Sequence, residues 1–167
     1  MNCDKCGLSK TRVNIVTGRG KPGASILIIG EGPGKSEDVL GQAFIGESGK
    51  LLDTLLGRAG FDIDDCFYTN TVFCRPCDSY SGENREPKPE EIFLCLNNVL
   101  QTISCLKNIK GIILAGKIAK KWYATRLKGI PQVCVIHPTA LLRQGGSASS
   151  HYRDALNALK EFYVQLR

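Results

Sequence analysis

Two cysteine pairs, each with two intervening residues, are the part of this sequence most suited to binding a metal. Cys3 and Cys6 form one pair, and Cys74 and Cys77 form the other. Two intervening residues let both thiols face one metal across a tight turn. Cys95 follows at the far end of a long polar segment. Four thiolates from this set could hold zinc or an iron–sulfur cluster, and the spacing does not decide between them.

Three other cysteines lie in apolar stretches, where a thiol usually behaves as a small buried side chain: Cys66, Cys105 and Cys134. The alternative for the metal-binding set is a chance pair near a chain end, with the remaining thiols buried. Disulfides are not expected, because the opening residues "MNCDKCGLSK" lack the apolar core of a signal peptide and indicate a reducing compartment.

The segment "GEGPGKSEDVLGQAFIG", residues 30–46, combines a glycine-rich turn with carboxylates. It directly follows the apolar run "SILII", so we expect it to be the turn after a buried strand. It matches neither the phosphate-binding loop nor the dinucleotide-binding glycine pattern. Glu31, Glu37 and Asp38 occur where a phosphate cradle needs no acid. We therefore expect this turn to hold something other than a free phosphate.

Two polar residues near strand ends and one aromatic residue are candidates for binding a flat ligand. His137 follows the apolar run "QVCVI", and Asn70 lies in the β-branched run "CFYTNTVF". An asparagine amide presents a donor beside an acceptor, which matches the polar edge of a pyrimidine. Phe44, between glycines, could stack on such a ring or fill the core. The structural alternative for His137 and Asn70 is a hydrogen bond that holds a loop.

The segment "HPTALLRQGG" places large apolar side chains beside a cation. Leu141 and Leu142, followed by Arg143, would suit an exposed loop that inserts a wedge between stacked bases. The alternative is the first turn of a helix whose leucines pack inward.

Alternating segments predict the scaffold that positions these residues. Strand-like runs occupy residues 25–30, 66–73, 111–116 and 132–138. Helical apolar spacing occupies residues 48–60, 89–106, 117–127 and 149–167. This order predicts an α/β fold with a mostly parallel sheet covered on both faces. Because ligands bind such sheets at the carboxyl ends of the strands, we expect one site formed by residues 31–34, Asn70, Gly116, Lys117, His137 and Pro138.

The composition fits a soluble enzyme or binding protein. The 167-residue chain is 43% apolar and 23% charged, which is ordinary for a globular protein. No apolar run approaches the ~20 residues of a membrane span, so we expect no membrane partner. The net charge of +6 is compatible with a polyanionic partner without requiring one. We expect a single domain over residues 1–167 that is monomeric and cytoplasmic or nucleoid-associated.

Together these motifs resemble one known family. The segments "CDKCGLSKTR", "GEGPGKSEDVLGQAFIGESGKLLDTLL", "YTNTVFCRP", "NREPKPEEIFLC" and "HPTALLR" occur in the order seen in the family 4, iron–sulfur uracil-DNA glycosylases of the uracil-DNA glycosylase superfamily. The resemblance runs from Cys3 to about Arg143. It implies a four-stranded parallel sheet in three αβα layers. It also implies a monofunctional enzyme of base excision repair, which hydrolyses the N-glycosidic bond of uracil in DNA and leaves an abasic site.

The resemblance further implies a 4Fe–4S cluster with a structural role, held by Cys3, Cys6, Cys74 and Cys95. Cys77 lies outside the family pattern, in what resembles an insertion between Pro76 and Asn84, and it remains an alternative to Cys74. No histidine occurs between Cys74 and Cys95, which argues against the related branch that captures the sugar covalently.

The resemblance also implies roles around a flipped nucleotide. The backbone of Gly30, Gly32, Pro33 and Gly34 would approach the sugar and base. Glu37 would exclude thymine, Phe44 would stack on uracil, and Asn70 would pair with its polar edge. His137 would bond the base oxygen that gains charge. Leu141 and Leu142 would fill the gap in the helix, and Arg143 would meet a phosphate.

The residue that prepares the water is less clear from the resemblance, because Gly32 stands where other glycosylases have an aspartate. We expect Glu31 to take this role.

Two alternatives remain for the function as a whole. One is a non-catalytic or retuned DNA-binding member that acts on another modified base or serves a replication partner. The other is a zinc-stabilised nucleotide-binding protein. Glu31, Asn70 and His137 together favour catalysis.

Overall fold

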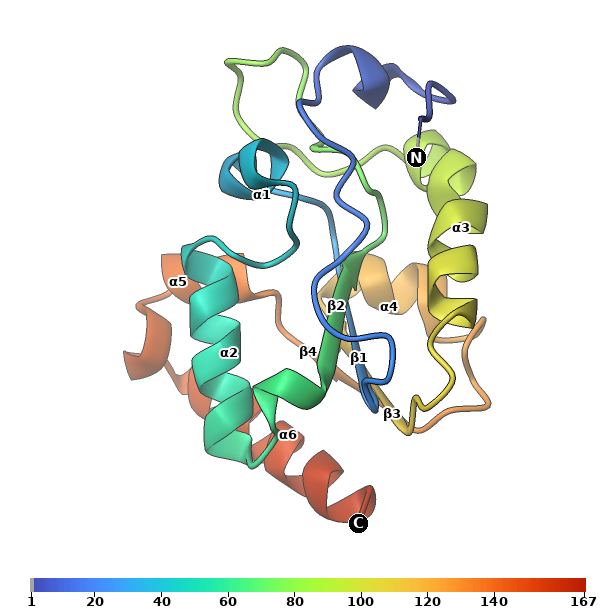
Figure 1. Ribbon diagram of the computed structural model, residues 1–167. Coiled ribbons are helices and arrows are strands. Elements are labelled where there is room, and N and C mark those ends of the chain that lie inside the picture. Colours follow the sequence, from blue (N-terminus) through green and yellow to red (C-terminus); the bar gives the residue numbers. More distant parts are fainter. Residues whose placement is uncertain (1) are drawn as a thin grey trace.

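A computed structural model describes residues 2–167 of the chain. Within these residues, a four-stranded parallel sheet has the order β2-β1-β3-β4 (Figure 1). The strands are β1 (Ile26–Gly30), β2 (Cys66–Asn70), β3 (Gly111–Ala115) and β4 (Gln132–Val135). β1 and β3 are buried along their whole length, as expected for central strands covered on both faces. The predicted α/β class is confirmed.

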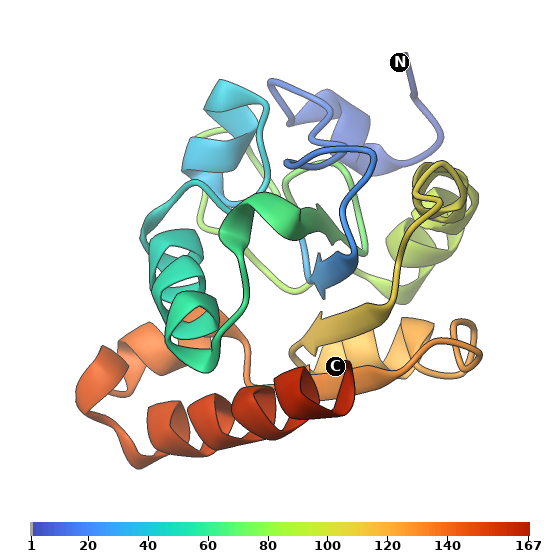
Figure 2. The same cartoon turned by 60° about the horizontal axis from the view of Figure 1, so that its bottom comes forward.

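Helices cover both faces of the sheet (Figure 2). They are α1 (Lys35–Leu40), α2 (Glu47–Ala59), α3 (Pro89–Ser104), α4 (Lys117–Tyr123), α5 (Pro138–Arg143) and α6 (Ser150–Gln165). Side chains alternate along β1: Ile26 and Ile28 pack with α2 and α6, whereas Leu27 and Ile29 pack with α3 and α4. The three αβα layers follow from this alternation.

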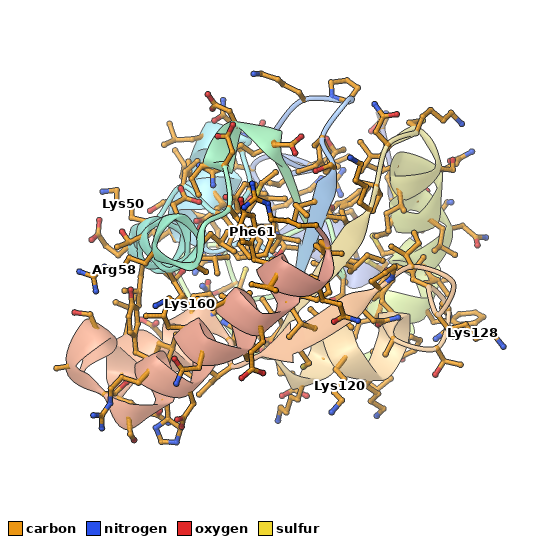
Figure 3. The ribbon with its side chains drawn as sticks, turned by 90° about the horizontal axis from the view of Figure 1, so that it is seen from below. Lys50, Arg58, Phe61, Lys120, Lys128 and Lys160 are labelled. Carbon is orange, nitrogen blue, oxygen red and sulfur yellow. The ribbon has the colours of Figure 1, made fainter. Side chains whose placement is uncertain are left out.

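Local sequence signals explain where the long helices begin and end. α2 ends at Ala59, and the next residue, Gly60, has a φ of 102°, in the left-handed region that glycine adopts without strain. α6 begins after Ser149, whose Oγ accepts the Tyr152 amide at 3.2 Å. Beyond Gly60, the Phe61 ring meets Phe162 and Tyr163 and closes the core between α2 and α6 (Figure 3).

Two short helices were not predicted. α1 begins directly after the glycine turn and ends at Leu40, just before Gly41, which has a φ of 73°. Its six residues are too few to show a helical apolar pattern. α5 occupies the segment that we expected to be a loop. The helix alternative is therefore the correct one for residues 138–143.

Some predictions for apolar segments were wrong. β2 ends at Asn70, although the pattern continued to Phe73. Val72 and Phe73 are buried, so the pattern there reflects burial without a strand. Cys66 is buried as expected, but Cys105 and Cys134 are exposed. Among residues 2–167, no helix is long and apolar enough to cross a membrane.

Candidate active site

A cavity of about 850 Å³ opens at the carboxyl ends of the strands, within the size range of small-molecule sites. It brings together predicted site residues from four separate segments, at or after the ends of β1, β2, β3 and β4: Glu31, Gly32, Pro33, Gly34, Glu37, Phe44, Asn70, Gly116, Lys117, His137 and Arg143. The strand order explains this convergence. Gly30 and Asn70 are register partners at the ends of β1 and β2, and the segments after β3 and β4 complete the edge.

The ring of Phe44 and the amide of Asn70 meet over Gly30. A Cβ on Gly30 would lie 2.4 Å from Phe44 Cζ and 2.6 Å from Asn70 Oδ1. Such distances are too short for any side chain, so glycine is required there. Gly30 therefore acts by leaving room for two groups that line the cavity, and its own atoms are not part of the lining.

Phe44 is held in an unusual backbone conformation. Its φ of 54° makes it the one non-glycine residue with a positive φ in the described chain. A Cβ on Gly49, in the first turn of α2, would lie 1.9 Å from the Phe44 carbonyl oxygen. Because Gly49 has no side chain, the Phe44 carbonyl oxygen can pack directly against its backbone. Strained residues of this kind persist where surrounding structure fixes them, often at functional sites.

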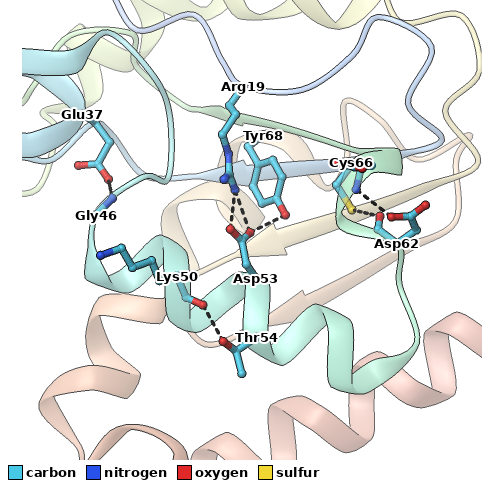
Figure 4. Close-up of polar contacts among 10 residues, drawn as sticks. Arg19, Glu37, Gly46, Lys50, Asp53, Thr54, Asp62, Cys66 and Tyr68 are labelled. Atoms are coloured by element: carbon cyan, nitrogen blue, oxygen red, sulfur yellow. Dashed lines mark hydrogen bonds and ion pairs between the residues drawn. The ribbon is translucent and has the colours of Figure 1, made fainter.

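A polar network of Arg19, Asp53 and Tyr68, drawn in Figure 4, lies behind the Phe44 ring. The Tyr68 ring packs against it with centroids 5.7 Å apart. Tyr68 donates its hydroxyl to Asp53 at 2.7 Å, and Arg19 Nη2 donates to the same carboxylate at 2.8 Å. Burial, followed by the bond to Asp53, raises the pKa of Tyr68 far above its ordinary value. Tyr68 therefore remains a donor, and the network fixes the surface behind Phe44.

Glu37 joins α1 to the segment that precedes α2 (Figure 4). Its Oε1 accepts the Gly46 amide at 2.7 Å, and the side chain is buried. A Cβ on Gly34 would lie 2.7 Å from Glu37 Oε2. Glycine at position 34 therefore lets the carboxylate form part of the cavity wall.

Glu31 lies on the cavity wall in a mixed electrostatic environment. Burial and the nearby Glu86 carboxylate raise its pKa, and Lys117 opposes this shift. Lys117 Nζ lies 3.1 Å from Glu86 Oε2, in an exposed pair of the kind that contributes little stability. Glu31 is thus a carboxylate whose basicity is increased, which suits a group that orients water.

His137 precedes α5 and directs one ring nitrogen into the backbone. Its Nδ1 accepts the Thr139 amide at 3.3 Å, so the proton of the neutral ring is assigned to Nε2. Burial lowers the pKa of His137 to about 4. His137 is therefore neutral near pH 7 and retains one N–H donor. Gly116 packs against the ring: a Cβ there would lie 3.3 Å from His137 Cδ2.

The two leucines of α5 face opposite environments, which corrects the prediction that both form a wedge. Leu141 is fully buried in the core with α2 and α6. Leu142 is 41% exposed, and the next residue, Arg143, lines the cavity. Leu141 is therefore unable to enter DNA, whereas Leu142 is free to do so.

A second, smaller cavity lies between the N-terminal segment and α3. It is lined by four thiols, those of Cys3, Cys6, Cys74 and Cys95. Arg12 Nη1 donates to Cys74 Sγ at 3.6 Å, and Asn98 Nδ2 donates to Cys3 Sγ at 3.8 Å. Cys77 does not line this cavity, and its Sγ donates to the Arg75 carbonyl at 3.7 Å.

The four thiols around this cavity are a donor set that suits zinc or an iron–sulfur cluster. Among residues 2–167, no three Cys, His, Asp or Glu side chains are close enough to hold one metal ion. Zinc would draw every sulfur to about 2.3 Å from one centre. A 4Fe–4S cluster instead takes one cysteine thiolate on each of its four iron atoms. Burial raises the pKa of Cys95 to about 11, so binding would release protons from these thiols.

Comparison with known proteins identifies the family. Residues 17–160 match the family model described as the Uracil DNA glycosylase superfamily. The chain belongs to this superfamily. The fold of this superfamily member is similar to a solution NMR structure of a putative uracil DNA glycosylase from Methanosarcina acetivorans. The TM-score is 0.51 at 13% identity, and the match covers 89% of this chain and 98% of that one.

Curated relatives place the superfamily member among the type-4 uracil-DNA glycosylases. The protein of that name from Pyrobaculum aerophilum is 36% identical, with 92% of this chain and 86% of the relative covered. Those from Archaeoglobus fulgidus and Thermotoga maritima are 32% and 35% identical, covering 85% and 84% of this chain and 79% and 78% of the relatives. The resemblance predicted from the motifs is confirmed.

Sequence reasoning missed one wall of the superfamily member's active-site cavity. Asn84, Arg85 and Glu86 line it, although they lie in a polar segment without a strand or helix. Lys120, one turn beyond Lys117 in α4, also lines it. The sequence did offer a signal for Lys120: it lies three residues after Lys117, and residues three apart in a helix share a face.

The two leucines of α5 give a matched pair of variants. Leu141→Ala should lower the free energy of unfolding by roughly 2–5 kcal/mol, because it leaves a void in the core. Leu142→Ala should change it by at most about 0.5 kcal/mol, because the side chain is partly exposed. Chemical denaturation measures both. If Leu142 fills the gap left by a flipped base, Leu142→Ala should slow excision from duplex DNA more than from single strands. Equal destabilisation by both variants would contradict the assignment.

Proposed function

We propose that this chain is a monofunctional uracil-DNA glycosylase that hydrolyses the N-glycosidic bond of uracil in DNA and leaves an abasic site for base excision repair. The observation that carries the proposal is the convergence of Phe44, Asn70 and His137 in one cavity. These side chains supply a stacking surface, a donor–acceptor pair and a neutral N–H donor. Together they match the face, the edge and a carbonyl oxygen of one pyrimidine.

Substrate binding would begin with extrusion of the nucleotide from the DNA strand. Unstacking costs a few kcal/mol, and it costs least in a single strand. Stacking on Phe44 and pairing with Asn70 would offset this cost. The Glu37 carboxylate, fixed by its bond to Gly46, would meet position 5 of the ring and exclude the methyl group of thymine.

His137 would stabilise the charge that forms as the bond between C1′ and N1 breaks. The departing uracil carries negative charge on its ring oxygens. A neutral His137 donating from Nε2 would bond one of these oxygens, because the Thr139 amide fixes the ring through Nδ1. A preorganised donor in a site shielded from water is a strong source of catalysis.

Water would then add to the oxocarbenium-like sugar. Glu31 is the carboxylate that remains available on this wall, because Glu37 bonds Gly46 and Glu86 pairs with Lys117. Glu31 would orient the water and accept its proton. The step needs no amine attached to the sugar, so no strand cleavage is expected.

Cys3, Cys6, Cys74 and Cys95 would hold a 4Fe–4S cluster, which supplies structural cross-linking. These cysteines come from the N-terminal segment, the segment after β2, and α3. The cluster would therefore fix the chain that leads from β2 to the cavity wall at Asn84. We propose that the protein acts as a monomer.

The pH dependence follows from the two perturbed groups. Because the pKa of His137 is lowered to about 4, the rate should show no change as pH passes 6.5, the ordinary histidine value. The raised pKa of Glu31 should set the acid limb of the pH–rate profile, and Glu31→Gln should remove that limb.

His137 should also make folding stability depend on pH. The unfolded state binds more protons at His137 between pH 6.5 and about 4, so the contribution of His137 to stability should fall as pH falls through this window. Rate profiles and denaturation across this range check both statements.

The proposal is tested by release of free base. Purified protein is incubated with single-stranded oligonucleotides that contain one uracil, or thymine at the same position, and the base released is quantified by chromatography. Uracil should be released and thymine retained. Retention of uracil by the cluster-loaded protein would overturn the proposal.

A further inference from the structure

The loop of residues 77–83 borders the active-site cavity but is not used in the mechanism above. It connects Pro76 and Asn84, which both line the cavity. In Figure 1 the segment between β2 and α3 passes over α1 at the end of the molecule where the strands end. The loop is therefore adjacent to one wall of the cavity.

A buried arginine holds the loop in shape. Arg75 is 2% exposed. It donates from Nη1 to the Tyr80 carbonyl at 3.0 Å, from Nη2 to the Gly82 carbonyl and from Nε to Asn84 Oδ1. In the described chain its partners are all neutral, and it has no carboxylate partner. A buried charge is costly unless it is fully hydrogen-bonded, so these bonds strongly favour the observed loop conformation.

Further contacts fix the ends of the loop. The Arg85 amide donates to the Pro76 carbonyl at 2.9 Å, which closes the base of the loop. The Arg85 side chain joins Asp78 at 2.8 Å to Glu91 of α3 at 2.7 Å. The loop is therefore attached to a long helix as well as to the cavity wall.

This rigid loop presents one large aromatic side chain to solvent. Tyr80 is 57% exposed, although its own carbonyl is held by Arg75. An exposed ring on a fixed backbone is suited to binding, because little conformational entropy is lost when a partner stacks on it.

Charge indicates which part of a DNA strand would face Tyr80. Lys117, Lys120 and Arg143 follow β3 and β4 and lie on that half of the cavity edge. On the other half, after β1 and β2, the cavity is lined by the carboxylates of Glu31, Glu37 and Glu86 and by Arg85, whose charge is paired with Asp78 and Glu91. Phosphates would turn toward the basic half, so the bases would turn toward the loop.

We propose that Tyr80 is a stacking platform for an unpaired base next to the flipped nucleotide. The proposal rests on the proposed function, since it assumes that DNA occupies the cavity. It commits to single-stranded DNA, because an unpaired base is free to turn out and lay one face on the ring, whereas a paired base is held in the helix by its partner.

The test uses the intact protein with Tyr80→Ala, Tyr80→Phe and the control Phe93→Ala. Phe93 is 67% exposed on α3 and lines neither cavity. Affinity is measured by fluorescence anisotropy on a single-stranded oligonucleotide that contains a non-hydrolysable uracil analogue. Quenching is measured with fluorescent aminopurine placed beside a non-hydrolysable uracil analogue.

Tyr80→Ala should weaken binding by about 5- to 150-fold, the equivalent of ~1–3 kcal/mol per stacked base, and should abolish quenching. Tyr80→Phe and Phe93→Ala should retain both signals. Wild-type affinity and quenching in Tyr80→Ala would overturn the platform while leaving uracil excision intact. A wild-type protein that binds through Tyr80 but releases no uracil would overturn the proposed function alone.

Discussion

Replacing His137 with alanine is expected to lower kcat for uracil excision by about 10²–10³, the usual loss when one donor to a developing oxyanion is removed. KM should change much less, because the bond strengthens as charge builds on the departing base. Single-turnover excision from a single-stranded oligonucleotide measures the chemical step directly. The loss should be the same at pH 6 and pH 8, since a pKa of about 4 keeps His137 neutral at both.

The other histidine of the chain provides the control. His151 is exposed on α6 and does not line the cavity. His151→Ala should excise uracil at the wild-type rate. An unimpaired His137→Ala, or an equal loss in both variants, would remove His137 from the mechanism.

Replacing Cys74 with serine is expected to abolish cluster binding, whereas replacing Cys77 should not. Cys74 lines the cavity with Cys3, Cys6 and Cys95, and Cys77 is buried outside it. The matched variants Cys74→Ser and Cys77→Ser therefore separate the two candidate ligands. The readouts are the iron content and the visible absorbance of the purified proteins. Bound zinc would give no visible absorbance, because its d shell is filled.

Loss of the cluster should also lower thermal stability, because a group that binds only the folded state stabilises it. Cys74→Ser should therefore melt at a lower temperature than Cys77→Ser. Iron retained in Cys74→Ser and lost in Cys77→Ser would reverse the ligand assignment. Zinc in the wild type without iron would contradict the cluster altogether.

Much of the fold was predictable because its signals are local. Central parallel strands are buried on both faces, so Ile26–Gly30 and Gly111–Ala115 appear as unbroken apolar runs. The ends of such strands lie at one edge, which is why Asn70 and His137 could be predicted to share a site. The cysteine cavity was anticipated from spacing and family resemblance, but the exclusion of Cys77 required the packed structure.

Other features depend on contacts that a sequence does not reveal. Leu141 and Leu142 are adjacent, and on a helix they point about 100° apart, so the two side chains can lie in different environments. Six residues are too few to show which of the two faces the core. The support of Phe44 by Gly49 and Tyr68 depends on backbone approach and tertiary packing, neither of which has a periodic pattern.

The measurement that tests the central claim most directly is alkali-dependent cleavage of a labelled single-stranded oligonucleotide with one uracil. The cluster-loaded wild-type protein should leave the strand intact until alkali is added and should then yield one break at the uracil position. This result would establish that the enzyme hydrolyses the glycosidic bond and leaves an abasic site. An uncut strand after alkali, or a break before alkali is added, would contradict the account.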